Sequence, residues 1–478
     1  MNNLEIKIAG ESVEIPEGRE YILKRKSPLF DKTEVLGDYM EEIDLPFTVN
    51  NDRILGHYRN PQVLDQPTRA YCEQSVNSNM MARGFVMPAS AIDSYKLAFT
   101  CGLADAFGNL RTKNLNEIDF GNIALPLPTI DRQNFYDNSI TNTWNNHGYT
   151  FPTIENEDFY GGINPEDFNG KLNDYTAGAY TPSTKVPYFF WKYIAQEIAT
   201  KVGWTFAGEW WNSEACSALL IDNTYSLDTL DSILIQNHLP TLTVGQFLLQ
   251  TAILDDVVLM FDVPNRILRF ELMDSFLKSS AALDWSSKCQ PITGKVSARV
   301  IGIELRWNLD GDDALAKVTD SFYQNYVTPG TDSEAEGLLK FETIWSSVVT
   351  SSNGFAIQKK QGITPINKQL DKKFTPRLVF WNGMVDGYPR ATNTLGTKKL
   401  QWNGAGGLYE TSWKREERFR MQTFQTPMVK ITLSESDLTE WSPEKKVHIN
   451  GVNYLFESID CPLHNLPQGC DGIGWRVW

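Results

Sequence analysis

The clearest alternation of apolar and polar positions lies in the middle of the chain, between Pro187 and Asp274. Its first part predicts a helix, because apolar side chains recur at steps of three and four residues on one stripe: Trp191, Ile194, Ile198 and Val202. Pro187 fits the first turn of this helix and Gly203 fits its C-terminal stop. The apolar run 204–206 then predicts a strand.

A second unit of the same kind follows. Thr243 is a candidate N-cap for a helix whose apolar face carries Val244, Phe247 and Leu248. Two β-rich runs come next, VVLMFDV and RILRFELM, and the Pro264-Asn265 step between them predicts a hairpin. The middle of the chain therefore predicts two helix-then-strand units.

The two ends of the chain read as β-structure. Residues 4–15 alternate around Ala9-Gly10, and the C-terminal run alternates around Asn450-Gly451, so both predict hairpins. The stretch 80–122 predicts further strands, and 408–421 predicts a helix rich in Lys and Arg. The Trp-Asn-Gly step at 381–383 is interpreted as a hairpin turn. The fold class expected is α+β, mainly β, with small barrels and short packed helices.

This pattern divides the chain into five segments. They are an N-terminal β-barrel domain (1–122), an irregular insertion rich in Asn, Tyr, Pro and Gly (123–187), a central α+β domain with a second barrel (188–310), an extended loop and strand region (311–375), and a C-terminal β-rich domain (376–478). A long irregular segment such as 123–187 is typical of a functional surface or a subunit contact.

Composition and charge argue against several classes of protein: disordered, membrane-spanning, secreted and nucleic-acid-binding. The 478 residues are 41% hydrophobic and 12% aromatic, which indicates a folded chain. No apolar run is long enough for a membrane span, and the N-terminus lacks the pattern of a signal peptide. The net charge of −15 argues against binding nucleic acid through phosphates. It suits a surface that DNA must pass without adhering.

Few residues suggest chemistry. Cys461, His464 and Cys470 are three soft ligands close together, but a metal would need a fourth ligand, and two thiols with a loop histidine are the favoured interpretation. The acidic group Asp310, Asp312 and Asp313 is read as a tight turn and not as a calcium loop. The six cysteines, at positions 72, 101, 216, 289, 461 and 470, show no metal-type pairing, and a reduced cytoplasm at synthesis is expected.

Other candidate features also have a structural explanation. The basic run Lys24–Lys26 is interpreted as a solvated strand edge. The 14 tryptophans could line a sugar groove, but core or interface use is favoured. A glycosidase would need two carboxylates across a cleft, and the sequence singles out no such pair. No catalytic, cofactor-binding or metal site, no cofactor and no enzymatic activity is predicted.

The order of segments resembles tail and baseplate hub proteins of tailed bacteriophages and related prophages. The segments that carry the resemblance are SPLF, LPFTVNNDRILG, YKLAFTCGL, VPYFFWKYIAQEIATKVGWTF, NHLPTLTVGQFLLQTAILDDVVLMFDVPNRILRF and KKVHINGVNYLFESI. The resemblance covers most of the chain except about 123–186 and 328–375, and each motif alone is weak.

The resemblance implies a structural virion protein of the phage tail, made in the host cytoplasm. Such hubs form trimers in which two similar β-barrels per subunit build a pseudo-sixfold ring. The ring joins the tail tube to the tail tip or spike and lines the channel through which DNA is ejected. The barrels would be 1–122 and one built from about 220–310. A trimer is favoured over a hexamer.

Two other functions stay open. A host-surface glycan-binding tail module would expose a Trp or Tyr platform. A polysaccharide or cell-wall hydrolase would show paired carboxylates in a cleft, one of them with a raised pKa.

Overall fold

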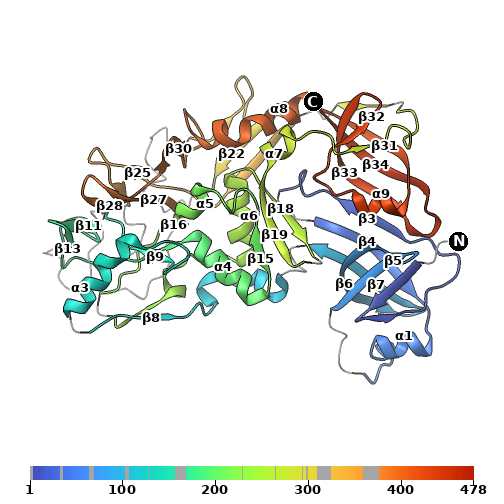
Figure 1. Cartoon of the computed structure of the whole chain (residues 1–478), viewed down its shortest axis with the longest axis horizontal. Coiled ribbons are helices and arrows are strands. Elements are labelled where there is room, and N and C mark those ends of the chain that lie inside the picture. Colours follow the sequence, from blue (N-terminus) through green and yellow to red (C-terminus); the bar gives the residue numbers. More distant parts are fainter. Residues whose placement is uncertain are drawn as a thin grey trace.

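The computed structural model describes residues 4–32, 36–63, 69–102, 107–127, 129–156, 168–228, 230–263, 265–292, 294–297, 300–308, 324–358 and 376–478. The chain is α+β and mainly β, as the sequence predicts. A large β-lobe lies at one end of the molecule and a mixed α/β body extends from it (Figure 1). The sheets of the described chain run as open strand orders, and the predicted closed barrels are not confirmed.

The β-lobe combines strands from both ends of the chain in one sheet. Its order is β2-β1-β5-β6-β7-β4-β3-β33-β34-β31-β21, with β32 paired to β33 and β20 to β32. The bounds are β1 (Leu4–Ile8), β2 (Glu11–Ser12), β3 (Ile22–Lys26), β4 (Leu36–Leu45), β5 (Ala70–Val76), β6 (Asn79–Ala91), β7 (Tyr95–Gly102), β20 (Leu283–Asp284), β21 (Val296–Ser297), β31 (Phe424–Leu433), β32 (Val447–Ile449), β33 (Val452–Pro462) and β34 (Gln468–Val477).

The two chain ends meet at the pairing of β3 with β33. This pairing is antiparallel and runs from Ile22 opposite Pro462 to Lys26 opposite Ser458. The interpretation of Lys24–Lys26 as a solvated strand edge is wrong, because β3 also pairs with β4 on its other side, through Lys24 and Tyr39. The Lys24 and Lys26 ammonium groups lie 5.6 and 5.1 Å from the centroid of the Tyr39 ring. The Tyr39 ring therefore accommodates two of the three basic residues inside the sheet.

The two hairpins at the chain ends are confirmed. Ala9 and Gly10 have φ values of 52° and 85°, and Asn450 and Gly451 have 48° and 87°. Two successive positive φ values match the right-handed twist of the strands that such a turn joins. The apolar positions of β1 face the core, and Ile6 is fully buried.

The first central helix, α4 (Trp191–Val202), ends at Gly203, whose φ of 69° is left-handed as predicted. The expected start at Pro187 is wrong. Residues Tyr188–Phe190 form β14, which pairs with β9 (Tyr149–Thr150) and β16 (Leu219–Ile221), so the helix begins only at Trp191. Pairing with two distant strands outweighs the local proline signal.

The second central helix, α6 (Val244–Leu254), is capped by Thr243 as predicted. The Thr243 hydroxyl accepts from the Gln246 backbone N–H at 3.2 Å, and the Gln246 side chain accepts from the Thr243 N–H at 3.0 Å. The hairpin of β18 (Val257–Asp262) and β19 (Ile267–Leu272) is also confirmed. β15 (Thr205–Ala207) adds to β19 in parallel and joins the two units in one sheet.

Replacing Thr243 with alanine should lower the free energy of unfolding by about 1 kcal/mol, because the Gln246 N–H loses its acceptor at the start of the helix. Urea unfolding of the variant checks this value. Thr112→Ala is the control, since the Thr112 hydroxyl is exposed and caps no α-helix. An equal loss in both variants would remove the capping explanation.

The segment 123–187 is packed into the body. It contains α3 (Thr129–Asn138), a helix that the sequence does not predict, and short strands: β8 (Asn122–Ala124), β10 (Ile154–Glu155), β11 (Lys171–Leu172), β12 (Tyr175–Thr176) and β13 (Ala179–Tyr180). Asn173 is fully buried, and its amide donates to the carbonyls of Pro152 and Val186. Asparagine thus supplies the hydrogen bonds that irregular buried backbone requires.

The rest of the body contains short elements. β27 (Leu378–Val385) continues through 381–383, where it has a bulge, so the predicted turn there is wrong. The turn to β28 (Tyr388–Thr392) is at Asp386-Gly387, with φ values of 49° and 81°. The helical prediction for 408–421 is confirmed by a π-turn (Tyr409–Trp413) and α8 (Lys414–Gln422).

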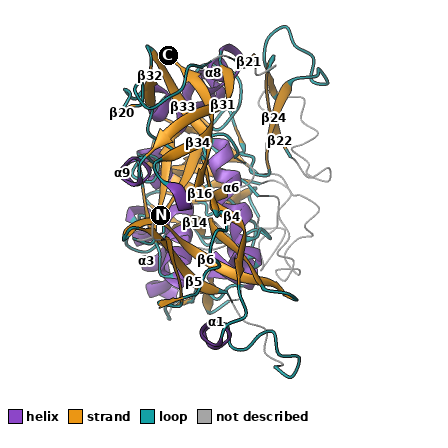
Figure 2. Ribbon diagram, turned by 90° about the vertical axis from the view of Figure 1, so that its right-hand side faces the viewer, coloured by secondary structure: helices purple, strands orange, loops and turns teal. Residues whose placement is uncertain are grey.

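The remaining elements are α1 (Val49–Ile54), α5 (Glu214–Ala218), α7 (Met273–Lys278), α9 (Glu435–Glu440), β17 (Ser232–Leu234), β22 (Gly302–Trp307), β23 (Tyr326–Val327), β24 (Leu338–Thr343), β25 (Val349–Thr350), β26 (Ala356–Ile357), β29 (Thr394–Leu395) and β30 (Lys398–Lys399). β22 and β24 lie side by side at one edge of Figure 2 and pack against α8 and α6 of the body.

An apolar cluster joins the β-lobe to the body. It brings together side chains from the segment after β3, from β18, α7 and α8, and from β33 and β34: Leu29, Val258, Met260, Met273, Leu277, Phe419, Leu455 and Val477. This cluster fixes the walls of the cavity described next.

Candidate interaction site

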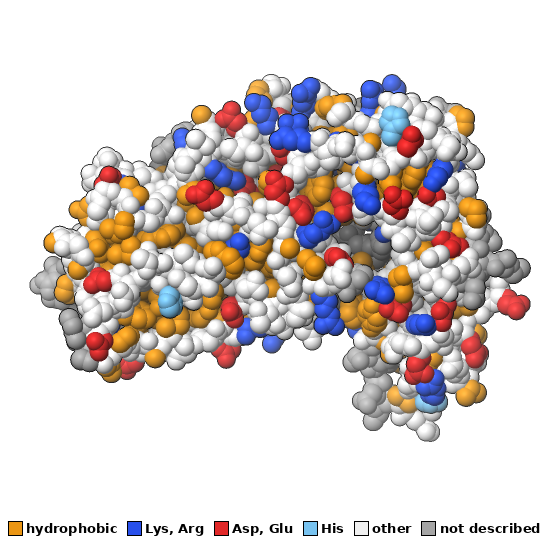
Figure 3. Space-filling view, in the orientation of Figure 1, with side chains coloured by type: hydrophobic (Ala, Val, Ile, Leu, Met, Phe, Trp, Pro, Cys, Tyr) orange, Lys and Arg blue, Asp and Glu red, His pale blue; other side chains and the backbone are white. Residues whose placement is uncertain are grey.

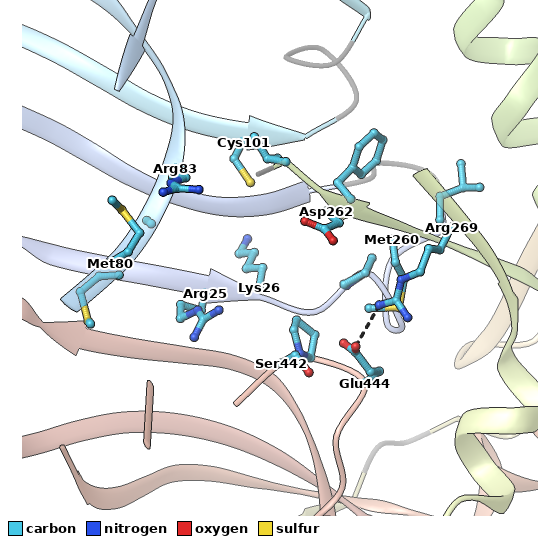
Figure 4. A pocket seen from close by; sticks show the side chains of 17 residues that line it. Arg25, Lys26, Met80, Arg83, Cys101, Met260, Asp262, Arg269, Ser442 and Glu444 are labelled. Carbon is cyan, nitrogen blue, oxygen red and sulfur yellow. Dashed lines mark hydrogen bonds and ion pairs between the residues drawn. The ribbon is translucent and has the colours of Figure 1, made fainter. Parts of the chain in front are cut away.

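A cavity of about 390 Å³ lies between the β-lobe and the central hairpin. Its walls come from three parts of the chain: strands β3, β6 and β7, the hairpin β18–β19, and the loop 442–444. Figure 4 shows these side chains around the cavity, and Figure 3 shows the hollow between the two parts of the molecule. Its volume is in the range of natural small-molecule pockets.

Four cationic side chains and two carboxylates line this cavity. Arg25, Lys26, Arg83 and Arg269 are the cations, and Asp262 and Glu444 are the acids. The walls are therefore net positive in a chain whose net charge is −15.

Some of these charges are already engaged. The Arg269 guanidinium donates to Glu444 at 2.9 Å, which ties the central hairpin to the loop 442–444 (Figure 4). Arg83 lies 3.3 Å from Glu73, and the Asp262 carboxylate accepts a 2.8 Å bond from the Asn265 amide. In the described chain no carboxylate lies within ion-pair distance of Lys26.

Arg25 of β3 joins this strand to α9 beside the cavity. It donates to the backbone carbonyls of Leu438 at 2.5 Å and Trp441 at 3.3 Å, and its guanidinium lies 5.0 Å from the Trp441 ring centroid. These carbonyls lie in and just after α9, where the helix dipole favours a cation. Arg25 therefore positions α9 against β3.

The apolar part of the lining is rich in sulfur. Met80, Met81 and Met260 line it together with Phe261, and the Cys101 thiol lies at its edge (Figure 4). Methionine side chains are flexible and polarisable and adapt to ligands of varied shape. The cavity therefore combines adaptable apolar contact with cationic groups.

Two adjacent acids behind the cavity are buried. Asp255 accepts hydrogen bonds from the Trp210 indole at 2.7 Å and the Ser412 hydroxyl at 2.9 Å, and it is ion-paired with Lys398. Burial alone would raise the pKa of Asp255, but Lys398 and these hydrogen bonds outweigh it and hold the pKa below its ordinary value.

Asp256 has the opposite shift. It forms an ion pair with Lys32, and both side chains are 2% exposed. Burial raises the pKa of Asp256 in spite of Lys32, and the neighbouring Glu416 carboxylate acts in the same direction. The pair fastens the segment after β3 to the start of β18, so it supports the cavity wall.

The three soft ligands named from the sequence do not assemble a metal site. Cys461 and Cys470 are buried in β33 and β34 as thiols, and His464 stacks on Tyr21 with ring centroids 5.4 Å apart. Burial lowers the pKa of His464. The described ranges contain no group of three His, Cys, Asp or Glu side chains that could hold a metal ion. Asp310, Asp312 and Asp313 lie outside the described residues.

The arrangement of acids offers no support for a hydrolase. Both carboxylates that line the cavity already accept hydrogen bonds, and the acid with a raised pKa, Asp256, is 1% exposed. A general acid has to reach its substrate. None of the helices in the described ranges has the length and apolar character to cross a membrane.

No local pattern in the sequence predicts the cavity, because its walls come from segments far apart in the chain. One local signal pointed near it: Asp255-Asp256 stands between an apolar helix and an apolar strand. Charges in such a context are normally buried and paired.

No protein-family model and no curated protein matches the chain. Solved structures of phage tail proteins align with it. The 43 kDa tail protein of prophage MuSo2 from Shewanella oneidensis aligns at 10% identity and a TM-score of 0.38, over 100% of this chain and 98% of that one. A tail protein from Neisseria meningitidis MC58 gives the same values. Prophage tail protein gp18 from Listeria monocytogenes EGD-e aligns at 8% identity and a TM-score of 0.35, over 99% and 94%. TM-scores of this size do not establish a shared fold.

Proposed function

We propose that the chain is a structural, non-enzymatic protein of a bacteriophage or prophage tail. The observation that carries the proposal is the β-lobe, in which the two chain ends form neighbouring β-units joined through β3 and β33. The resemblance to tail hub proteins implies two similar β-barrels in each subunit, 1–122 and one built from about 220–310, and the N-terminal part of the β-lobe falls within the first of these ranges. The strands described between 220 and 310 build the small sheet β15-β19-β18, part of the sheet of β14 and short pairs, so a second barrel there stays a prediction.

The finer role we propose is that of a hub or baseplate component. It would assemble as a ring, with a trimer favoured over a hexamer, between the tail tube and the tail tip or spike. DNA would pass through its lumen during ejection without specific binding, which suits a net charge of −15.

Two experiments test this role. Light scattering after size-exclusion chromatography should give a trimer at three times the 54.2 kDa of one chain. Antibody labelling of particles from the inducible prophage or phage that encodes the chain should mark the tail end in electron micrographs. A chain absent from purified particles would refute the tail role, and a hexamer would favour a tail-tube or distal ring.

The glycan-binding alternative gains no support from the described residues. It needs an exposed platform of Trp or Tyr, and among the described side chains of these two types Trp478, after β34, is exposed at 51% and Tyr71, in β5, at 38%, so the exposed rings lie on separate strands. Trp191, Trp402 and Trp413 are fully buried, which is the core use favoured from the sequence.

A further inference from the structure

We propose that the cavity receives the acidic loop 331–337 of a second copy of this chain. The inference deepens the proposed tail role, since it names the contact through which copies would join. It rests on two surfaces of the same chain that have opposite charge.

The loop 331–337 connects β23 and β24 and carries three acids in the sequence TDSEAEG. Asp332, Glu334 and Glu336 are all exposed, and Glu334 has 84% of its side chain in solvent. Glu334 lies 3.8 Å from Arg306 and 3.5 Å from Lys340 of its own copy. In the described chain, Asp332 and Glu336 have no ion-pair partner.

The loop has a defined shape. Backbone bonds from Thr331 to Thr328 and from Ala335 to Asp332 close two turns, at 3.1 and 3.0 Å. Gly330 and Gly337 at its two ends have φ values of 84° and 90°. A loop held in turns loses less conformational entropy when it docks.

The cavity offers what such a loop requires. Lys26 has no carboxylate partner among the described residues, and Arg83 forms an ion pair with Glu73. Arginine and lysine bind carboxylates through charge-assisted hydrogen bonds. The methionine-rich wall would cover the small apolar part of the loop at Ala335.

The loop cannot be assigned to the cavity of its own copy. The loop precedes β24, which packs with β22 against α6 and α8 of the body, and none of its residues lines the cavity between β3, β6 and β18. Because the loop and the cavity are different surfaces, the contact is heterologous, and repetition of it closes a ring or extends a stack.

Charge-reversal variants test the contact. The cavity variant is Lys26→Glu/Arg83→Gln, and the loop variant is Asp332→Lys/Glu336→Lys, which leaves Glu334 with Arg306 and Lys340. Each should weaken self-association, measured by light scattering, at least about tenfold, as expected for close interfacial charges. The exposed charges Lys113 and Glu17 give matched controls, Lys113→Glu and Glu17→Lys, which should leave association unchanged.

Mixing the two variants gives the decisive measurement. Each variant alone should be a monomer, and an equimolar mixture should associate again, because the acidic loop of the cavity variant meets the unchanged cavity of the loop variant and the reversed charges of the other loop and cavity also attract. Circular dichroism and the unfolding midpoint show that both variants are folded.

Three results would overturn the inference: oligomers of unchanged size in both variants, a mixture that stays monomeric, or a wild-type chain that is monomeric at its highest soluble concentration. The first leaves the tail role standing, because copies then join elsewhere. Loss of the tail role shows instead as absence of the chain from purified particles.

Discussion

Replacing Trp191 with alanine should lower the free energy of unfolding by about 3–5 kcal/mol, the range for removing a large buried aromatic side chain. Trp191 is fully buried at the start of α4. Its ring stacks on Phe247 of α6 at 5.0 Å between centroids and meets the edges of Trp210 at 5.2 Å and Phe270 at 6.1 Å. The substitution therefore leaves a cavity where both central units pack together.

The conservative variant Trp191→Phe separates volume from hydrogen bonding. Within the described chain the Trp191 indole N–H has no hydrogen-bond acceptor, so phenylalanine loses packing volume alone. We expect it to cost less than half as much as alanine. The measurement is urea unfolding followed by circular dichroism, with Trp478→Ala as the control, because Trp478 is 51% exposed. A loss in Trp191→Ala no larger than in Trp478→Ala would show that the central core does not depend on this ring.

Local signals in the sequence were sufficient for much of the fold. Asn450-Gly451 fixes a hairpin because both residues accept positive φ, and Thr243 with Gln246 fixes a helix start through reciprocal hydrogen bonds. Gly203 ends α4 for a similar reason. Each of these choices is decided within a few residues, so no distant contact has to be known.

Strand pairing between segments far apart in the chain could not be predicted from the sequence. β3 pairs with β33 from the other end of the chain, and any amphipathic strand offers the same backbone groups to many partners. Pro187 gave the wrong result because pairing of Tyr188–Phe190 with distant strands overrode a local preference. The Trp-Asn-Gly step at 381–383 gave the wrong result because it forms a bulge within β27 and the turn lies at Asp386-Gly387. The cavity brings together β3, the β18–β19 hairpin and the loop 442–444, which lie far apart in the chain.

The Asn-rich segment 123–187 shows a different limit of prediction from sequence, because composition does not reveal burial. Its composition suggested an irregular surface insertion, yet Asn173 is fully buried and bonds to the backbone at Pro152 and Val186. A polar amide can be solvated by water or by buried backbone, and composition does not distinguish these environments.

Replacing Lys32 with methionine should lower the free energy of unfolding by about 3–5 kcal/mol, because it leaves the Asp256 carboxylate buried without its cation. Lys32 and Asp256 are 2% exposed, and the Lys32 ammonium lies 4.9 Å from the Trp413 ring centroid. The control is Lys96→Met, whose ion pair with Glu42 is 43% and 39% exposed and should contribute less than about 1 kcal/mol.

The loss in Lys32→Met should depend on pH. Burial raises the pKa of Asp256 from 3.8 to about 7 in the folded wild type, and loss of the Lys32 charge raises it further. The folded state then holds a proton that the unfolded state releases, so stability falls as pH rises from 3.8 through 7. Urea midpoints should show a larger difference between variant and wild type above pH 7 than below it. A difference that grows on acidification would contradict this assignment.

A double variant tests whether the charge of Asp256 causes the loss. Asparagine suits position 256, because it tolerates the left-handed backbone there, with φ of 55°. Lys32→Met in the Asp256→Asn background removes no attraction to a buried charge, so its cost should fall by at least about 1.5 kcal/mol and lose its pH dependence. The same cost in both backgrounds would mean that Lys32 acts through packing against Trp413, and that the junction of the two lobes is held by apolar contact alone.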